Sequence, residues 1–309
     1  MQPEMPESVI AGPPTTAAPP SSAPCSECAG RASLPPEQFA YTIGRLEVRF
    51  PSLGIEREYQ QRERAIADLP QHPRNARIRA VLEQNPHLAT RVGWVFTIGG
   101  NPAFALSPAS AGLKEQFFSA LSHSQDNDHF CVAIGRVGPF VNPAMYGGLL
   151  LPLLQVDQLY PTTHGEWSAS LSHSAQAALK SRKIDTDQFH AISQGIFRDV
   201  TGMPENMGLS EGHRALNYLL IQHPGMFLAA AERKNHQLDR IETRLLLAVG
   251  GRRHVAVILT FLDRSTGVPE RVFCTVDITE EWPFVVGGDS SLSPLGFAPF
   301  LESGFYASA

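Results

Sequence analysis

Three apolar runs in the C-terminal third of the chain are separated by turns too short to hold a helix. The runs cover Thr243 to Val249, His254 to Leu262 and Arg271 to Ile278. Gly250-Gly251 separates the first two runs, and Ser265-Thr266-Gly267 lies between the second and the third. Strands joined by such short connections pair with their neighbours in antiparallel fashion. The sequence therefore predicts an antiparallel β-meander in this region.

The preceding part of the chain carries both strand and helix periodicity. Tyr41 to Phe50 alternates between apolar and polar residues and stops at Pro51, which is typical of a half-buried strand. Trp167 to Asn235 has mainly helical spacing. We therefore predict an α+β fold, in which an N-terminal mixed α/β subdomain is followed by a helical segment and then by the antiparallel β-meander. Further helices are expected over Ile55 to Leu69, Pro73 to Leu82 and Leu113 to Leu121, and further strands over Val92 to Ile98, Ala103 to Leu106, His129 to Ile134 and Leu149 to Val156.

Composition divides the chain into four regions. Residues 1–37 form a disordered tail rich in Pro, Ala and Ser, because nine of the 25 prolines lie at or before Pro36 and such a segment buries too little apolar surface to become ordered. An N-terminal α+β subdomain covers residues 38–161, and the helical segment with the meander covers residues 162–287. A C-terminal tail covers residues 288–309. Its aromatic residues are expected to dock on the core or on a partner: Phe297, Phe300 and Phe305.

Charge and hydropathy exclude two classes of partner. The chain has 25 basic and 30 acidic residues and a net charge of -5, so the phosphate backbone of a nucleic acid finds no basic surface to bind. No stretch approaches the roughly 18 apolar residues that span a bilayer. The N-terminus also lacks the basic and apolar regions of a signal peptide. We therefore expect a cytoplasmic protein that binds neither nucleic acid nor membranes.

Cys25 and Cys28 have the spacing of half a zinc site. Two thiolates three residues apart can reach one tetrahedral ion, and the other ligands could come from Cys131, Cys274, a histidine or a second chain. The alternative is a pair of linker cysteines without metal. Structural zinc is therefore the candidate cofactor, and no complete nucleotide-binding motif is present.

A helix expected to begin after Ser210 carries a polar cluster. His213 and Asn217 are four residues apart and share a face, and Arg214 lies beside His213. Such a cluster could bind a carboxylate or a peptide backbone, and His213 could transfer protons near neutral pH. We favour a structural interpretation, because a buried guanidinium needs a carboxylate partner and can fix the helix to the end of the meander. The candidate carboxylates are Asp277, Glu280 and Glu281.

Two distant segments carry the most distinctive sequence of the chain, Leu209 to Leu219 and Val276 to Phe284. They resemble the C-terminal domain of the PatG and PatA cyanobactin-maturation proteases, and the resemblance runs from about Tyr41 to Val286, including Leu151 to Tyr160. One pair departs from it: Tyr146-Gly147 stands where the family has Cys-Asn, so the metal role of that cysteine is not expected here. The resemblance implies a role in the maturation of ribosomally made peptides. It implies no particular reaction, because the domain has no assigned chemistry in that family.

The resemblance leaves two functions open. In the relatives the domain is joined to a protease, and we expect this chain to be a free-standing form of it. The first function is a non-catalytic accessory or recognition module that positions a precursor peptide or a modifying enzyme of the same pathway, which the absence of a complete catalytic motif favours. The second is a peptide-modifying enzyme that uses a bound metal or the cluster of His213, Arg214 and Asn217.

Overall fold

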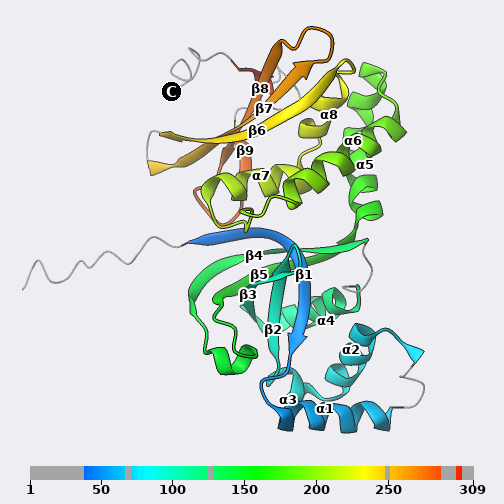
Figure 1. The fold of residues 1–309 in the computed structure, drawn as a ribbon, viewed down its shortest axis with the longest axis vertical. Coiled ribbons are helices and arrows are strands. Elements are labelled where there is room, and N and C mark those ends of the chain that lie inside the picture. The colour runs from blue at the N-terminus through cyan, green and yellow to red at the C-terminus, as the bar shows by residue number, and fades with distance from the viewer. Residues whose placement is uncertain (1–37, 67–70, 124–127, 248–250, 287–296, 301–309) are drawn as a thin grey trace, which may run out of the picture. The chain divides into compact units, whose positions relative to one another are not determined.

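Strand β1 (Phe39–Arg49) begins a closed five-stranded barrel in the computed structural model of the chain (Figure 1). The barrel order is β1-β2-β3-β5-β4. The predicted tail, with Cys25 and Cys28, lies outside the described residues. The structure describes residues 38–66, 71–123, 128–247, 251–286 and 297–300. The other barrel strands are β2 (Gly93–Ile98), β3 (Asn101–Pro108), β4 (His129–Phe140) and β5 (Pro152–Thr163).

Strand β1 changes its partner halfway along its length. Phe39 to Gly44 pair with β4, and Arg45 to Arg49 pair with β2, both in antiparallel fashion. A Cβ atom on Gly44 would lie 2.2 Å from the carbonyl oxygen of Thr97, so only glycine permits the close approach of the strands at this point. β3 and β5 pair in parallel. The barrel therefore closes through two long-range pairings, β1 with β4 and β3 with β5.

Helices pack at the end of the barrel where β1 and β3 finish (Figure 1). Ser52 caps the first of them, because its Oγ accepts a hydrogen bond from the N–H of Ile55 at 3.4 Å. The apolar residues of these helices and of the barrel interior form one core. This core includes Leu46 and Phe96 from the barrel and Phe117 from a helix. The elements are α1 (Leu53–Ala65), α2 (Arg74–Gln84) and α3 (Pro86–Ala89) before β2, η2 (Ala111–Leu113) and α4 (Lys114–His123) before β4, and η3 (Pro143–Tyr146) before β5.

The second half of the chain places four helices against one face of a second sheet. The strand order is β10-β8-β7-β6, β9 also pairs with β8, and all pairs are antiparallel. The apolar face of β7 that includes Val257 and Phe261 packs with the helices in a second core. The helices are α5 (His164–Arg182), α6 (Thr186–Thr201), α7 (Glu211–Gln222) and α8 (Gly225–Ala231). The strands are β6 (His236–Leu247), β7 (Arg253–Asp263), β8 (Pro269–Asp277), β9 (Phe284–Val286) and β10 (Ala298–Pro299).

The predicted α+β class and the antiparallel meander are confirmed. The hairpin around Gly99 and Gly100 is also confirmed, and both glycines have positive φ, 57° and 82°. Phe297 docks in the core between sheet and helices, and Phe300 packs on the opposite face of the sheet against Phe273, with ring centroids 5.8 Å apart. The boundary predicted at residue 161 stays a prediction. Among the described residues, no helix has both the length and the apolar character that crossing a membrane requires.

Candidate functional site

Helix α7 is seated tightly on the second sheet. Ser210 is its N-cap, as predicted, and its Oγ accepts a hydrogen bond from the N–H of His213 at 3.1 Å. A Cβ atom on Gly212 would lie 2.3 Å from Oγ1 of Thr243 on β6. The absence of a side chain at this position therefore lets the helix approach the strand closely.

Arg214 binds main-chain carbonyl groups and not the carboxylates that were predicted. The residue is 2% exposed, and its guanidinium donates to the carbonyl oxygens of Ile278 at 3.0 Å, Glu281 at 3.2 Å and Glu280. The turn after β8 presents these three oxygens together, so they supply the partner that a buried cation requires. Burial lowers the pKa of Arg214 to about 10, which leaves it charged at neutral pH. The side chain fixes α7 to the end of the meander.

Asn217 connects the same helix to the barrel. Its Nδ2 donates to the carbonyl oxygen of Tyr41 on β1 at 2.9 Å, and its Oδ1 accepts from Asn206 at 2.7 Å. Tyr218 packs edge-on against Tyr41, with ring centroids 6.2 Å apart. Asn217 therefore binds the barrel while Arg214 binds the turn after β8.

The remaining predicted residues do not form one cluster. Asp277 lies 3.4 Å from Arg252 and 3.2 Å from His254, and it accepts a hydrogen bond from the N–H of Thr279 at 2.8 Å. His213 is half-buried, and burial lowers its pKa, so it is neutral at pH 7. The histidine and the aspartate are thus held apart by the elements that carry them.

A carboxyl pair that sequence reasoning missed lies where the second half of the chain meets the barrel. Burial, followed by the neighbouring carboxylate of Asp157 on β5, raises the pKa of Glu281 to about 7, and Arg136 and Arg214 oppose this shift. Oε1 of Glu281 and Oδ2 of Asp157 are buried and have no hydrogen-bond donor among the described residues. A proton on the Glu281 carboxyl group accounts for both observations, because it can be donated toward Asp157. Both residues belong to the segments that carry the family resemblance, which was the only sequence signal for the pair.

A groove of about 940 Å³ runs along the outer face of β1. Tyr41 and Ile43, on the first half of this face, are buried under the helices of the second half. Arg45, Glu47 and Arg49 continue the same face beyond those helices and line the groove. In Figure 1, β1 follows α7 and then bends toward α1, which explains why only its second half is open. Ile43, Gly44 and Val48 of β1 also contribute to the lining. Further lining residues are Phe50, Glu56, Arg74, Asn75, Ile78, Thr97, Gly99, Gly100, His129, Phe130, Gly147, His164, Phe197 and Thr201.

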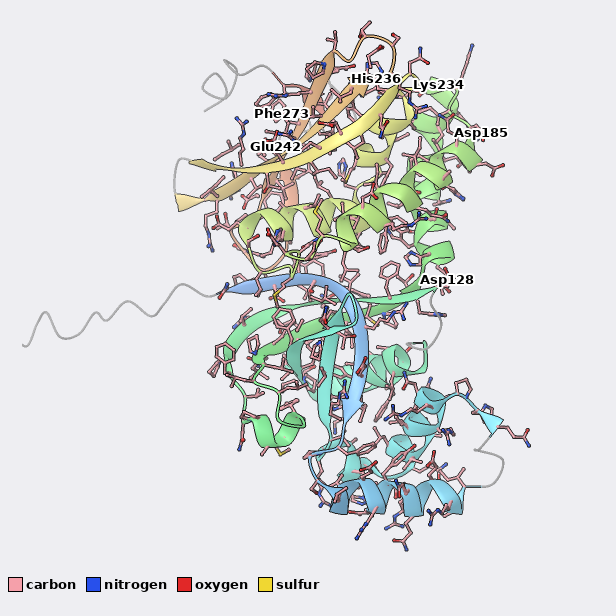
Figure 2. The ribbon with its side chains drawn as sticks, in the orientation of Figure 1. Asp128, Asp185, Lys234, His236, Glu242 and Phe273 are labelled. Atoms are coloured by element: carbon pink, nitrogen blue, oxygen red, sulfur yellow. The ribbon has the colours of Figure 1, made fainter. Side chains whose placement is uncertain are left out.

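Three aromatic rings form one end of this groove. His164 is the first residue of α5. The centroid of its ring lies 5.0 Å from that of Phe130 and 4.7 Å from that of Phe197. Its main-chain N–H donates to the carbonyl of Asp128 at 2.9 Å, and Figure 2 shows Asp128 beside the start of α5. The pKa of His164 is lowered by burial and, in smaller measure, by Arg45 and His129, although Asp128 opposes this. The end of the groove is therefore aromatic and neutral at His164, with Arg45 next to it.

The groove was not predicted, because its residues come from β1, β2, β4 and six separate helices or turns. Only the alternation of polar residues along Tyr41 to Phe50 marked one outward face of a strand. The rings that contact each other there are more than thirty positions apart in the sequence.

The described cysteines do not resemble metal ligands. Cys131 and Cys274 are buried, and burial raises the pKa of each thiol to about 12. No group of three or more His, Cys, Asp or Glu side chains arranged to hold a metal occurs in the described part of the chain. Zinc binding through Cys25 and Cys28 stays a prediction, since both lie outside that part.

Comparison with known proteins relates the chain to one family. A family model described as PatG Domain matches residues 39–194, and a model described as PatG C-terminal matches residues 183–291. The solved structure of a PatG Domain of Unknown Function aligns with a TM-score of 0.59 and 18% sequence identity. The alignment covers 81% of this chain and 97% of the solved one, so the two share a fold. No curated protein matches the sequence significantly.

Proposed function

Because this chain belongs to the PatG Domain family, we propose that it is a non-catalytic accessory module that recognises a peptide during the maturation of a ribosomally synthesised peptide of the cyanobactin type. Its partners are the precursor peptide or the modifying enzymes of that pathway. Membership of this family supports a role in peptide maturation. The observation that supports recognition is the groove along β1.

The volume and the lining of the groove suit an extended peptide. Small-molecule sites occupy about 300–1,000 Å³, and the groove lies at the upper end of that range. Arg45 and Arg74 can bind carboxylates, Glu47 and Glu56 can bind basic groups, and the rings of Phe130, His164 and Phe197 can contact an apolar side chain. Mixed charge together with aromatic surface is what a peptide of varied sequence requires.

The alternative function, a modifying enzyme built on His213, Arg214 and Asn217, has less support. Arg214 and Asn217 use their donors on carbonyl oxygens of the protein itself. A catalytic base must also lie within hydrogen-bond reach of its substrate, and His213 lines neither this groove nor two smaller cavities of about 290 Å³ and 360 Å³ in the described part of the chain. These contacts suit a role in holding α7.

The proposal is tested by titrating a fluorescent precursor peptide, taken from a neighbouring gene, into the protein. We expect Arg45→Glu to weaken binding at least tenfold, because it reverses a charge inside the groove. Lys234→Glu is the matched control, since it makes the same charge change on an exposed residue beside β6 (Figure 2) and should leave the affinity unchanged.

The mass of the peptide decides between recognition and catalysis. The peptide is incubated with this protein alone, without the other components that modify the precursor. We expect its mass to stay unchanged. A mass change that disappears in His213→Ala or on metal removal would replace the accessory function with the enzymatic one. Equal weakening by Arg45→Glu and Lys234→Glu would remove the groove from the proposal.

A further inference from the structure

A second cavity, of about 290 Å³, opens at the end of the barrel where β2 begins and β3 finishes. It shares no lining residue with the β1 groove. Its walls come from α3, β2, β3, α4 and η3. The lining residues are Ala89, Thr90, Val92, Trp94, Leu106, Ser107, Pro108, Lys114, Phe117, Phe118, Met145 and Tyr146.

The walls of this cavity are aromatic. The ring of Trp94 contacts those of Phe117 and Phe118, with centroids 5.4 Å and 6.1 Å apart. Tyr146 closes the side formed by η3, and burial raises its pKa. Protein interiors are packed with few voids larger than a water molecule, so an open space of this size between rings is a site that an apolar group can fill. Its volume is close to the lower end of ligand sites, about 300 Å³, and suits one large side chain.

The cavity has one charged residue at its edge. Lys114 is the first residue of α4 and is exposed. It is the only charged side chain in the lining, and no ion pair of Lys114 occurs among the described residues. A ligand that carries a carboxylate next to its apolar group would place that charge within reach of the ammonium group.

Exposed apolar residues lie close to η3 in the sequence. Met145, in η3, lines the cavity, and two further side chains are exposed, Phe140 at the end of β4 at 65% and Leu150 before β5 at 64%. Large exposed apolar side chains grouped on one segment mark an interaction surface. The cavity therefore opens where a peptide or protein segment would find apolar contacts.

We propose that this pocket binds an aromatic or large aliphatic residue that carries a free carboxylate, as the C-terminal residue of a peptide does. The apolar side chain packs against Trp94, Phe118 and Tyr146. The carboxylate pairs with Lys114. The site is separate from the β1 groove and does not require that the groove bind a peptide.

The probes are N-acetylphenylalanine, its amide, which lacks the carboxylate, and N-acetylalanine, which lacks the ring. Binding is followed through the indole N–H signals of the three tryptophans in nuclear magnetic resonance spectra. We expect N-acetylphenylalanine to shift the Trp94 signal and to leave those of Trp167 and Trp282 in place. The amide should bind at least fivefold more weakly, and N-acetylalanine should cause no shift.

Two variants separate the parts of the site. Lys114→Gln should weaken the binding of N-acetylphenylalanine at least fivefold and leave the binding of the amide unchanged. Lys180→Gln, which changes an exposed lysine of α5, should alter neither affinity. Ser107→Phe should fill the pocket and abolish the binding of both the acid and the amide. An unchanged melting temperature shows that this variant is folded. Arg45→Glu should have no effect, which distinguishes this site from the groove. A Trp94 signal that does not move, or equal binding of acid and amide, would overturn the proposal.

Discussion

The buried polar side chains of α7 donate hydrogen bonds to main-chain carbonyl groups of distant segments. Arg214 and Asn217 lie one helical turn apart, yet one binds the turn after β8 and the other binds β1. Glu281, whose carbonyl accepts from Arg214, directs its own carboxyl group toward Asp157 of the barrel. A few polar residues therefore join α7, the meander and the barrel at one place. The carboxyl pair within that group makes the junction sensitive to pH.

We expect Arg214→Ala to destabilise the fold by about 3 kcal/mol, because it leaves the buried carbonyl oxygen of Ile278 and the partly buried ones of Glu280 and Glu281 without this donor. His213→Ala should cost about 1 kcal/mol or less, since this half-buried ring is near the surface. Urea denaturation of the two variants and the parent protein measures both values. An Arg214→Ala variant as stable as the parent but unable to bind peptide would assign this residue to a binding site.

Glu281 should make stability fall as pH rises. Its pKa in the folded protein, about 7, lies above the ordinary value of 4.5, so the folded state holds the proton more tightly than the unfolded state. The contribution is complete below about pH 4.5 and is lost as pH rises through 7. We expect the parent protein to lose roughly 2 kcal/mol relative to Glu281→Gln between pH 5 and pH 8.5, less than the full pKa shift implies, because solvent screens a partly exposed carboxyl group.

The comparison between parent and variant removes other titrations from this measurement. His164 and His213 have lowered pKa values, so they reduce stability toward acid, in the opposite direction. They are present in both proteins and cancel in the difference. Parallel pH profiles for the parent protein and Glu281→Gln would contradict the raised pKa of Glu281.

Among the elements, β1 does the most to define the molecule. Its first half pairs with β4 and its second half pairs with β2, and the change takes place at Gly44 and Arg45. The same bend takes the outer face of the strand out from under α7 and opens it as the groove. A change in the geometry of this bend should therefore affect folding and binding together.

Gly44→Ala tests the bend. The added methyl group would meet the carbonyl oxygen of Thr97, and we expect a loss of about 3 kcal/mol of stability from this overlap. Gly195→Ala, inside α6 with open space around its Cβ position, is the matched control and should raise stability by about 1 kcal/mol. Calorimetric melting of both variants provides the comparison, and a neutral Gly44→Ala would mean that the strands can separate at this point without cost.

In the molecule as a whole, β1 connects the two hydrophobic cores. Tyr41 and Ile43 belong to the core between the helices and the second sheet, whereas Leu46 and Val48 belong to the core of the barrel. One continuous strand therefore supplies side chains to both. If β1 separates from one core, its apolar side chains also leave the other core. The apolar surface of both cores is then exposed.

We predict that both cores unfold in one transition, because this strand couples them. Trp94 reports on the barrel core and Trp167 on the other, so fluorescence of the double variants Trp94→Phe/Trp282→Phe and Trp167→Phe/Trp282→Phe follows each core separately. For each variant, the midpoint of urea unfolding is first measured by circular dichroism and compared with that of the parent protein. Fluorescence midpoints in urea that differ from the circular dichroism midpoint of the same variant would show that the cores unfold independently.

The sequence determined the features that depend on residues close together in the chain. The meander, the turn at Gly99 and Gly100 and the N-cap at Ser210 follow from local periodicity and turn chemistry, and the family resemblance follows from the order of short motifs. The tertiary structure alone decided the closure of the barrel, the acceptors of Arg214, the Asp157 and Glu281 pair and the two cavities. Asn217 and its acceptor Tyr41 are 176 positions apart, and no local pattern specifies which distant carbonyl group a buried donor will meet. That choice depends on how the two cores pack around β1.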